Sequence, residues 1–122
     1  MSEKEIVTNI FGDEIEACCY DPMTGYFRDG FCNTDEHDYG SHVVCAVMTD
    51  DFLEFSKSKG NDLSTPRPEF NFPGLKEGDR WCLCALRWKE AYDAGVAPKV
   101  HLESCHLNSL NFVTKEQLEE YA

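Results

Sequence analysis

The chain has 122 residues and a net charge of −12, with 42% apolar and 28% charged residues. This length and composition are typical of one folded domain and argue against a disordered protein. The excess of acids disfavours nucleic acids and anionic membranes as partners, because lysine and arginine recognise both. No apolar run approaches the roughly 20 residues that a membrane span needs.

These properties predict a single domain over residues 1–122, with residues 1–8 as a candidate flexible N-terminus. Residues 1–11 lack the basic start and apolar core of a signal peptide, which predicts a cytoplasmic protein. An odd number of cysteines cannot pair completely within one chain, and in a reducing compartment we expect free thiols. The seven cysteines are Cys18, Cys19, Cys32, Cys45, Cys82, Cys84 and Cys105.

Turn signals divide the first 48 residues into short segments typical of β-strands. Gly12-Asp13 and Asp29-Gly30 suit two-residue hairpin turns, because glycine tolerates a positive φ. Residues 42–48 are mostly apolar and rich in β-branched side chains, which predicts a central, buried strand. The strands expected in this half are residues 6–11, 14–19, 26–28, 31–33 and 42–48.

Two main helices are predicted in the second half. Residues 49–59 have Thr49 as an N-cap and Gly60 as a terminator. Residues 79–95 carry apolar side chains at helical spacing. Between the helices, residues 60–79 contain three prolines and show no clear period. A segment of this kind is either functional or contains an undetected element.

The C-terminal part is predicted to contain a last short helix, because Thr114 and Gln117 form a capping box. We also expect strands at residues 99–104 and 111–113 and a helical turn at 105–110. Together these elements predict an α+β fold, in which a small, mainly antiparallel sheet carries two main helices and a short C-terminal helix.

Four stretches of the chain carry a family resemblance. They are residues 21–30 (DPMTGYFRDG), 40–49 (GSHVVCAVMT), 60–68 (GNDLSTPRP) and 78–85 (GDRWCLCA). Through them the chain resembles the family catalogued as domain of unknown function 2237, over roughly residues 9–121. The resemblance implies one small domain with no established activity and supplies no catalytic residue. The family pattern also has cysteine at Cys18, Cys32, Cys45, Cys82 and Cys84, but not at Cys19 and Cys105.

Cys82 and Cys84 are the first candidates for chemistry. On a strand both thiols would point to one face and could share a metal, whereas on a helix they diverge by about 200°. The helical pattern favours divergence, with Cys84 in the core. Cys82 is also a candidate nucleophile, expected in the first turn of a helix close to Arg80. A wider zinc site would draw its ligands from Cys18, Cys32, Cys82, Cys84 and His42.

A polar pocket is the second candidate. Arg67 lies between Pro66 and Pro68, so its backbone is stiff and its guanidinium can be presented to a carboxylate or phosphate. Residues 55–99 hold eight bases and six acids, which suits a small anionic ligand, although the overall charge also serves solubility. Alternatively, the arginines pair with nearby aspartates and pin the loop. The candidate ligand-binding residues are Arg28, Asp29, His42, Asp62, Arg67 and Arg80.

The sequence therefore predicts a non-catalytic binding or interaction module whose recognition loop is residues 60–80. Its partner would be a small molecule or another protein, with no cofactor. The alternative is a small thiol- or metal-dependent enzyme, with zinc as the metal. Its residues would be Cys82 or Cys84 with Cys18, Cys32 and His42.

Overall fold

The computed structural model describes residues 7–70 and 72–122. At its centre is a three-stranded antiparallel sheet in the order β2-β1-β3. The strands are β1 (His42–Val47), β2 (Arg80–Cys84) and β3 (Lys99–Val100). Cys45 lies opposite Cys82 in the β1–β2 pair, and Ala46 lies opposite Val100 in the β1–β3 pair. The predicted central strand is confirmed as β1.

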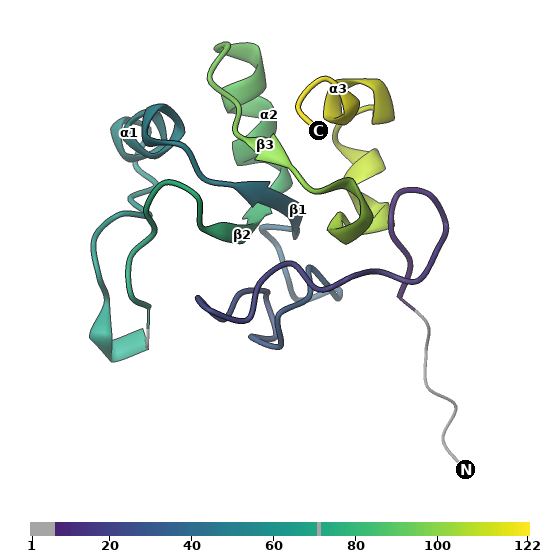
Figure 1. The fold of residues 1–122 in the computed structure, drawn as a ribbon, viewed down its shortest axis with the longest axis horizontal. Helices are drawn as coiled ribbons and strands as arrows, with labels where there is room; N and C mark the ends of the chain where they lie inside the picture. Colours follow the sequence, from purple (N-terminus) through teal and green to yellow (C-terminus); the bar gives the residue numbers. More distant parts are fainter. Residues whose placement is uncertain (1–6, 71) are drawn as a thin grey trace.

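The three α-helices lie on one side of the sheet and the N-terminal loops on the other (Figure 1). This arrangement confirms the predicted α+β fold. None of the helices in the described part of the chain is long and apolar enough to cross a membrane. The α-helices are α1 (Asp50–Ser58), α2 (Ala85–Asp93) and α3 (Lys115–Glu119), and the 3-10 helices are η1 (Pro68–Phe70), η2 (Leu102–Ser104) and η3 (Leu107–Asn111).

Side-chain caps explain why α1 and α3 begin where the sequence predicts. Thr49 Oγ1 accepts a hydrogen bond of 3.1 Å from the Phe52 N–H at the start of α1. At α3, Thr114 Oγ1 accepts from the Gln117 N–H at 3.1 Å, and Gln117 Oε1 accepts from the Thr114 N–H at 3.0 Å. Each cap satisfies N–H groups that have no partner within the helix, so both predicted helices are confirmed.

The main core lies between the sheet and the helices. Trp88 on α2 and Phe52 on α1 are almost completely buried, as are Val43 and Val44 on β1. The Trp88 indole N–H donates to the Pro98 carbonyl at 3.1 Å, so its one polar atom is satisfied in the core. Burial on both faces of β1 explains its nearly continuous apolar sequence.

The strands predicted in the first 33 residues are wrong wherever the structure describes them. Residues 14–19, 26–28 and 31–33 form turns and loops, with only isolated bridges such as Thr8 with Glu14. Short segments separated by tight turns provide too few cross-strand contacts to form a ladder. The predicted strand at residues 6–11 lies partly outside the described residues, as does most of the candidate flexible segment 1–8.

The predicted helix over residues 79–95 is wrong in its first part, because residues 80–84 form β2 and α2 begins at Ala85. Trp81, Cys82 and Leu83 are all buried, and a short apolar run of this kind fits a buried strand as well as a helix. The short strand expected at residues 111–113 is also absent, because η3 and a turn occupy these positions.

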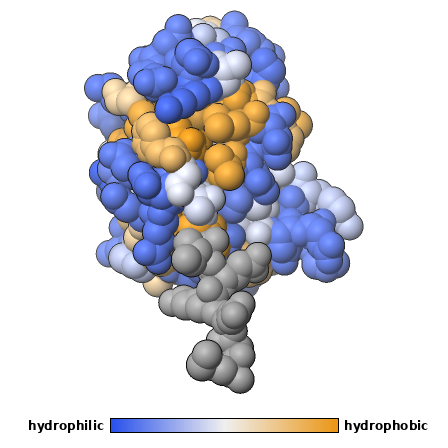
Figure 2. Space-filling model, turned by 90° about the vertical axis from the view of Figure 1, so that its right-hand side faces the viewer, coloured by the Kyte–Doolittle hydropathy of each residue, from blue (hydrophilic) through white to orange (hydrophobic). Residues whose placement is uncertain are grey.

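One further prediction in the C-terminal part needs correction, because the strand expected at residues 99–104 ends at Val100 and is followed by η2. The helical turn expected at 105–110 is present as the 3-10 helix η3. Apolar side chains gather on the side of the molecule that carries the N-terminal loop, η3 and α3 (Figure 2). The exposed large apolar residues of these segments include Phe11, Leu107 and Leu110.

Candidate functional site

A cavity of about 320 Å³ opens between the N-terminal loops, the start of β2 and the loop that follows α1. Its size falls within the range of small-molecule sites. Arg28, His42 and Arg67 provide basic groups, and no carboxylate is among its lining residues. The remaining lining residues are Gly25, Tyr26, Leu63, Phe70, Phe72, Trp81 and Cys82.

Aromatic contacts hold two of the basic groups of the cavity, Arg28 and His42, in place. The Arg28 guanidinium carbon lies 4.9 Å from the centroid of the Trp81 ring. The Tyr26 ring stacks on His42, with centroids 6.5 Å apart and planes inclined by 18°. The Trp81 ring also meets Phe72 edge to face. Cation–π and stacking contacts restrict these side chains without neutralising their charge.

Two residues beside the cavity have an uncommon backbone conformation. Arg28 has φ of 54° and Ser41 has φ of 48°, and neither is glycine. The left-handed region is disfavoured for residues with a Cβ atom, so surrounding contacts must hold these conformations. Such residues are concentrated at binding and catalytic sites, which agrees with the position of this pair beside the cavity.

The His42 ring is oriented by a buried carboxylate. Asp38 Oδ1 lies 2.7 Å from His42 Nδ1, and the Asp38 side chain is 1% exposed while that of His42 is 41% exposed. Asp38 Oδ2 also accepts hydrogen bonds from the His42 N–H at 2.9 Å and from the Thr34 hydroxyl at 3.0 Å. Asp38 therefore fixes the ring, while the rest of the imidazole faces the cavity.

These hydrogen bonds keep Asp38 ionised. Burial alone would raise the pKa of the Asp38 carboxyl, but the His42 N–H, the His42 ring and the Thr34 hydroxyl together lower it below its usual value. Nothing in the sequence singled out Asp38. The sequence signal that could have found it is that Asp38, at the end of an acidic loop, precedes His42 by four residues.

A second hollow of about 210 Å³ shares His42, Leu63 and Trp81 with the main cavity. It is also lined by Cys84, a half-buried free cysteine that lies opposite His42 in the β1–β2 pair. Cys84 is the N-cap residue of α2, where no side-chain hydrogen bond caps the helix. A thiol and a carboxylate-bound imidazole thus face one hollow.

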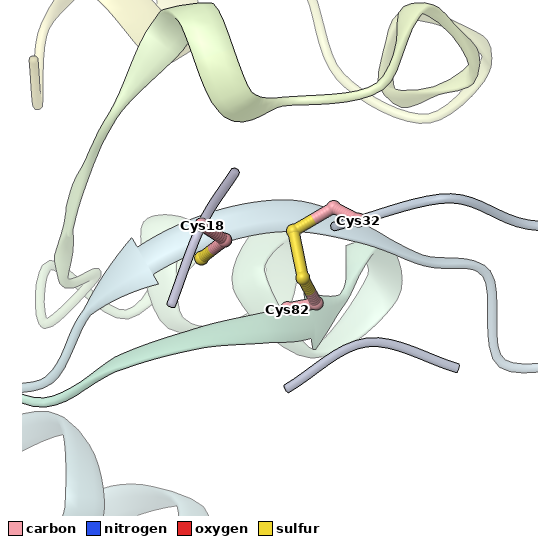
Figure 3. A group of neighbouring side chains, drawn as sticks. All are labelled: Cys18, Cys32 and Cys82. Carbon is pink, nitrogen blue, oxygen red and sulfur yellow. A yellow bond between two sulfur atoms is a disulfide. The ribbon is translucent and has the colours of Figure 1, made fainter. Parts of the chain in front are cut away.

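Four of the seven cysteines form two disulfides, so the prediction that all thiols are free is wrong. Cys18 is bonded to Cys45 with an S–S distance of 2.15 Å, and Cys32 is bonded to Cys82 at 2.05 Å. Figure 3 shows the Cys32–Cys82 bond with Cys18 beside it. Each bond links an N-terminal loop to a strand of the sheet, a long-range pairing that local sequence patterns do not reveal.

The structure also changes the roles expected for Cys82 and Cys84. Cys82 lies at the centre of β2 and not in the first turn of a helix, and its sulfur is bonded to Cys32. The sulfurs of Cys18, Cys32 and Cys82 lie within 4.8 Å of one another, but Cys84 is not part of this group. The structure adds Cys45, which sequence reasoning had left out of the metal site.

The other candidate ligand-binding residues lie outside the main cavity. Asp29 and Asp62 accept hydrogen bonds from nearby residues and shape their own turns. Arg80 begins β2 and does not line the cavity. Within residues 7–70 and 72–122, none of the ion pairs involves Arg28, Arg67 or Arg80, so the alternative that they pin the loop by pairing with aspartates has no contact to support it.

The fold and the site define a small α+β protein in which two disulfides fix a layer of loops over a sheet, beside a basic, aromatic cavity. The chain belongs to the family described as uncharacterized protein conserved in bacteria (DUF2237), whose sequence profile matches residues 8–122. This match confirms the predicted resemblance. No curated protein matches the chain.

Proposed function

We propose that the protein binds a small anionic molecule that carries an aromatic or apolar group. One observation carries the proposal: in a chain of net charge −12, the cavity is lined by two arginines and a histidine and by no carboxylate of residues 7–70 and 72–122. In a protein with about twice as many acidic as basic residues, a group of basic side chains around one cavity requires a specific explanation. Binding of an anion provides that explanation.

The chemistry of the arginines supports the choice of ligand. A guanidinium without a carboxylate partner is free to form a bidentate pair with a carboxylate or phosphate group. Neither Arg28 nor Arg67 has an ion-pair partner in the part of the chain that the structure describes. The rings of Phe72 and Trp81 favour a flat apolar group beside the anion.

The proposal predicts that phenyl phosphate or phenylacetate binds, and that loss of either arginine weakens binding. Arg28→Asn removes the charge while retaining a residue that tolerates a positive φ, and Arg67→Gln removes the second charge. Because each change deletes one charge-assisted pair, we expect about 10- to 100-fold weaker binding of the better probe by isothermal titration calorimetry.

Arg80→Gln is the matched control, because Arg80 lies outside the cavity. Inorganic phosphate, compared with phenyl phosphate, measures the contribution of the aromatic group. Phenyl phosphate compared with phenylacetate distinguishes the two anionic groups. Equal weakening by Arg80→Gln, or equal affinity of all three arginine variants and the wild type, would contradict the proposal.

A second candidate function is thiol-dependent chemistry at Cys84. The Asp38–His42 distance of 2.7 Å favours it, because a carboxylate that orients an imidazole beside a thiol is the arrangement used to activate nucleophiles. In that reaction the Cys84 sulfur would add to a carbonyl carbon, the C=O π electrons would move onto the carbonyl oxygen, and His42 would take the thiol proton. Cys84, and not Cys82, is the nucleophile in this version of the enzyme hypothesis.

This candidate predicts selective alkylation of Cys84 by iodoacetamide. In the native protein we expect Cys84 to react, whereas burial raises the pKa of Cys105 to about 12 and keeps that thiol unreactive. His42→Gln should slow the reaction of Cys84 about 10-fold or more if the imidazole takes the proton. Rates are followed by mass spectrometry of the modified peptides.

Cys19 is the internal control, because it is also free and half-buried but does not line the hollow of His42 and Cys84. Its alkylation rate should be the same in the wild type and in His42→Gln. If Cys84 reacts at one rate in both proteins, the imidazole does not assist the thiol and this second candidate is wrong.

A further inference from the structure

The four bonded cysteines come together from four separate segments of the chain. The Sγ atoms of Cys18, Cys32 and Cys82 all lie within 4.8 Å of one another, and Cys45, which lies outside this group, is joined to it by its bond to Cys18. Two of the cysteines lie opposite each other on β1 and β2, and the other two lie on the loops that cover these strands (Figure 3).

This cluster has the composition of a metal site. The four side chains are at most 4% exposed, and the group of neighbouring ligand atoms contains sulfur but no carboxylate or imidazole. Structural zinc sites use four thiolates with Zn–S bonds of about 2.3 Å, which places the sulfurs about 3.8 Å apart in a tetrahedron. The separations among Cys18, Cys32 and Cys82 therefore require only small side-chain movements to reach that geometry.

We propose that, once the two disulfides are reduced, Cys18, Cys32, Cys45 and Cys82 bind one Zn²⁺ ion as a closed tetrathiolate centre. A dithiol supplies the electrons: two equivalents deliver four electrons and four protons, cleave both S–S bonds and become two cyclic disulfides. Zn²⁺ then displaces the four thiol protons to solvent. Disulfide and zinc are mutually exclusive, because each sulfur takes part in one or the other.

The scaffold supports this exchange. Cys45 and Cys82 are fixed at the centre of the sheet by the β1–β2 ladder, whereas Cys18 and Cys32 lie on loops that can shift toward the ion. Both states tie the same loops to the same strands, so the metal can replace the covalent links without a change of fold. Thiolate ligands also select Zn²⁺ over Mg²⁺ and Ca²⁺, which prefer oxygen.

The test starts from the full chain, reduced with a dithiol without oxygen and exchanged into metal-free buffer. The reduced protein is titrated with Co²⁺ and then with Zn²⁺. We expect one metal ion per chain by elemental analysis, and the intense visible absorption of tetrahedral cobalt thiolate, lost on addition of one equivalent of Zn²⁺. At a urea concentration that unfolds the metal-free reduced chain, bound zinc should also protect four thiols from iodoacetamide, those of Cys18, Cys32, Cys45 and Cys82.

Cys45→Ser and Cys105→Ser are a matched pair, because both cysteines are completely buried and Cys105 is not part of the cluster. Loss of a ligand should weaken Co²⁺ binding on the order of 100-fold or more, whereas Cys105→Ser should bind like the wild type. If Cys45→Ser does not fold, the protection pattern of the wild type decides. A reduced protein that retains no metal, or protection of Cys19 or Cys84, would overturn the proposal.

Discussion

Reduction of both disulfides in the presence of a metal chelator is expected to lower the free energy of unfolding by at least about 4 kcal/mol. The bonds close loops of 27 and 50 residues, for which the loss of chain entropy in the unfolded state amounts to about 3.5 and about 4 kcal/mol. The two loops overlap in sequence, so their joint contribution is smaller than the sum. It is still a large share of the 5–15 kcal/mol typical of a domain.

The structure explains why the effect should be large here. Residues 7–41 contain no helix and no strand of the sheet, so few backbone ladders hold them in place. Each disulfide attaches this layer to the sheet, at Cys45 on β1 and at Cys82 on β2. Since Tyr26 and Arg28 belong to the layer and line the cavity, reduction should also weaken ligand binding.

The measurement is urea unfolding of the oxidised and the reduced protein, followed by far-UV circular dichroism. Cys19→Ser in the oxidised protein is the control, because Cys19 is free and its loss should change stability by less than about 1 kcal/mol. Equal unfolding midpoints for the oxidised and reduced forms would show that packing alone holds the loops. Addition of Zn²⁺ to the reduced protein should recover stability if the four cysteines bind it.

The elements that could be predicted from the sequence are those whose causes are local. Thr49 and Thr114 cap α1 and α3 through hydrogen bonds to residues three positions later. A short stretch of sequence that contains the cap is therefore enough to predict each helix. The strand β2 depends on pairing with the distant strand β1; Cys82, for example, pairs with Cys45, which lies 37 residues earlier. Its apolar sequence runs directly into α2, and local periodicity cannot separate the two.

The candidate site was predictable to a similar extent. Arg28, His42 and Arg67 were identified because they lie on turns and loops, and the fold brings them to one cavity. Asp38 was missed because an acidic loop residue is normally solvated, and only the fold shows that it is buried against His42. The cysteine pairs were missed because they join residues 27 and 50 positions apart in the sequence. The odd number of cysteines was also interpreted as evidence for free thiols.

Asp38→Ala is expected to lower the free energy of unfolding by about 3 kcal/mol at neutral pH. The substitution removes a buried carboxylate, leaves the His42 N–H without its acceptor, and leaves the Thr34 hydroxyl with only the more distant Asp35 carbonyl. It also frees the His42 ring, so affinity for the anionic probe should fall together with stability. Urea unfolding and calorimetry of the same variant measure the two effects separately.

Asp62→Ala provides a control matched in hydrogen bonds but not in burial. Asp62 also accepts three hydrogen bonds and also has a lowered pKa, because of the Thr65 hydroxyl and the Ser64 and Thr65 N–H groups, but it is only half-buried and these hydrogen bonds are exposed. Water can replace its contacts, so we expect a much smaller loss of stability than for Asp38→Ala. Equal losses for the two variants would mean that burial of Asp38 contributes nothing.

The pH dependence of the Asp38→Ala effect tests the cause directly. The fold lowers the pKa of Asp38 below its usual 3.8, so the stabilisation by the carboxylate is fully present above that value and is lost as pH falls through the lower value in the folded protein. The difference in stability between wild type and Asp38→Ala should therefore shrink as pH falls into the acid range. A difference that stays constant down to strongly acidic pH would assign the effect to packing of the side chain and not to its charge.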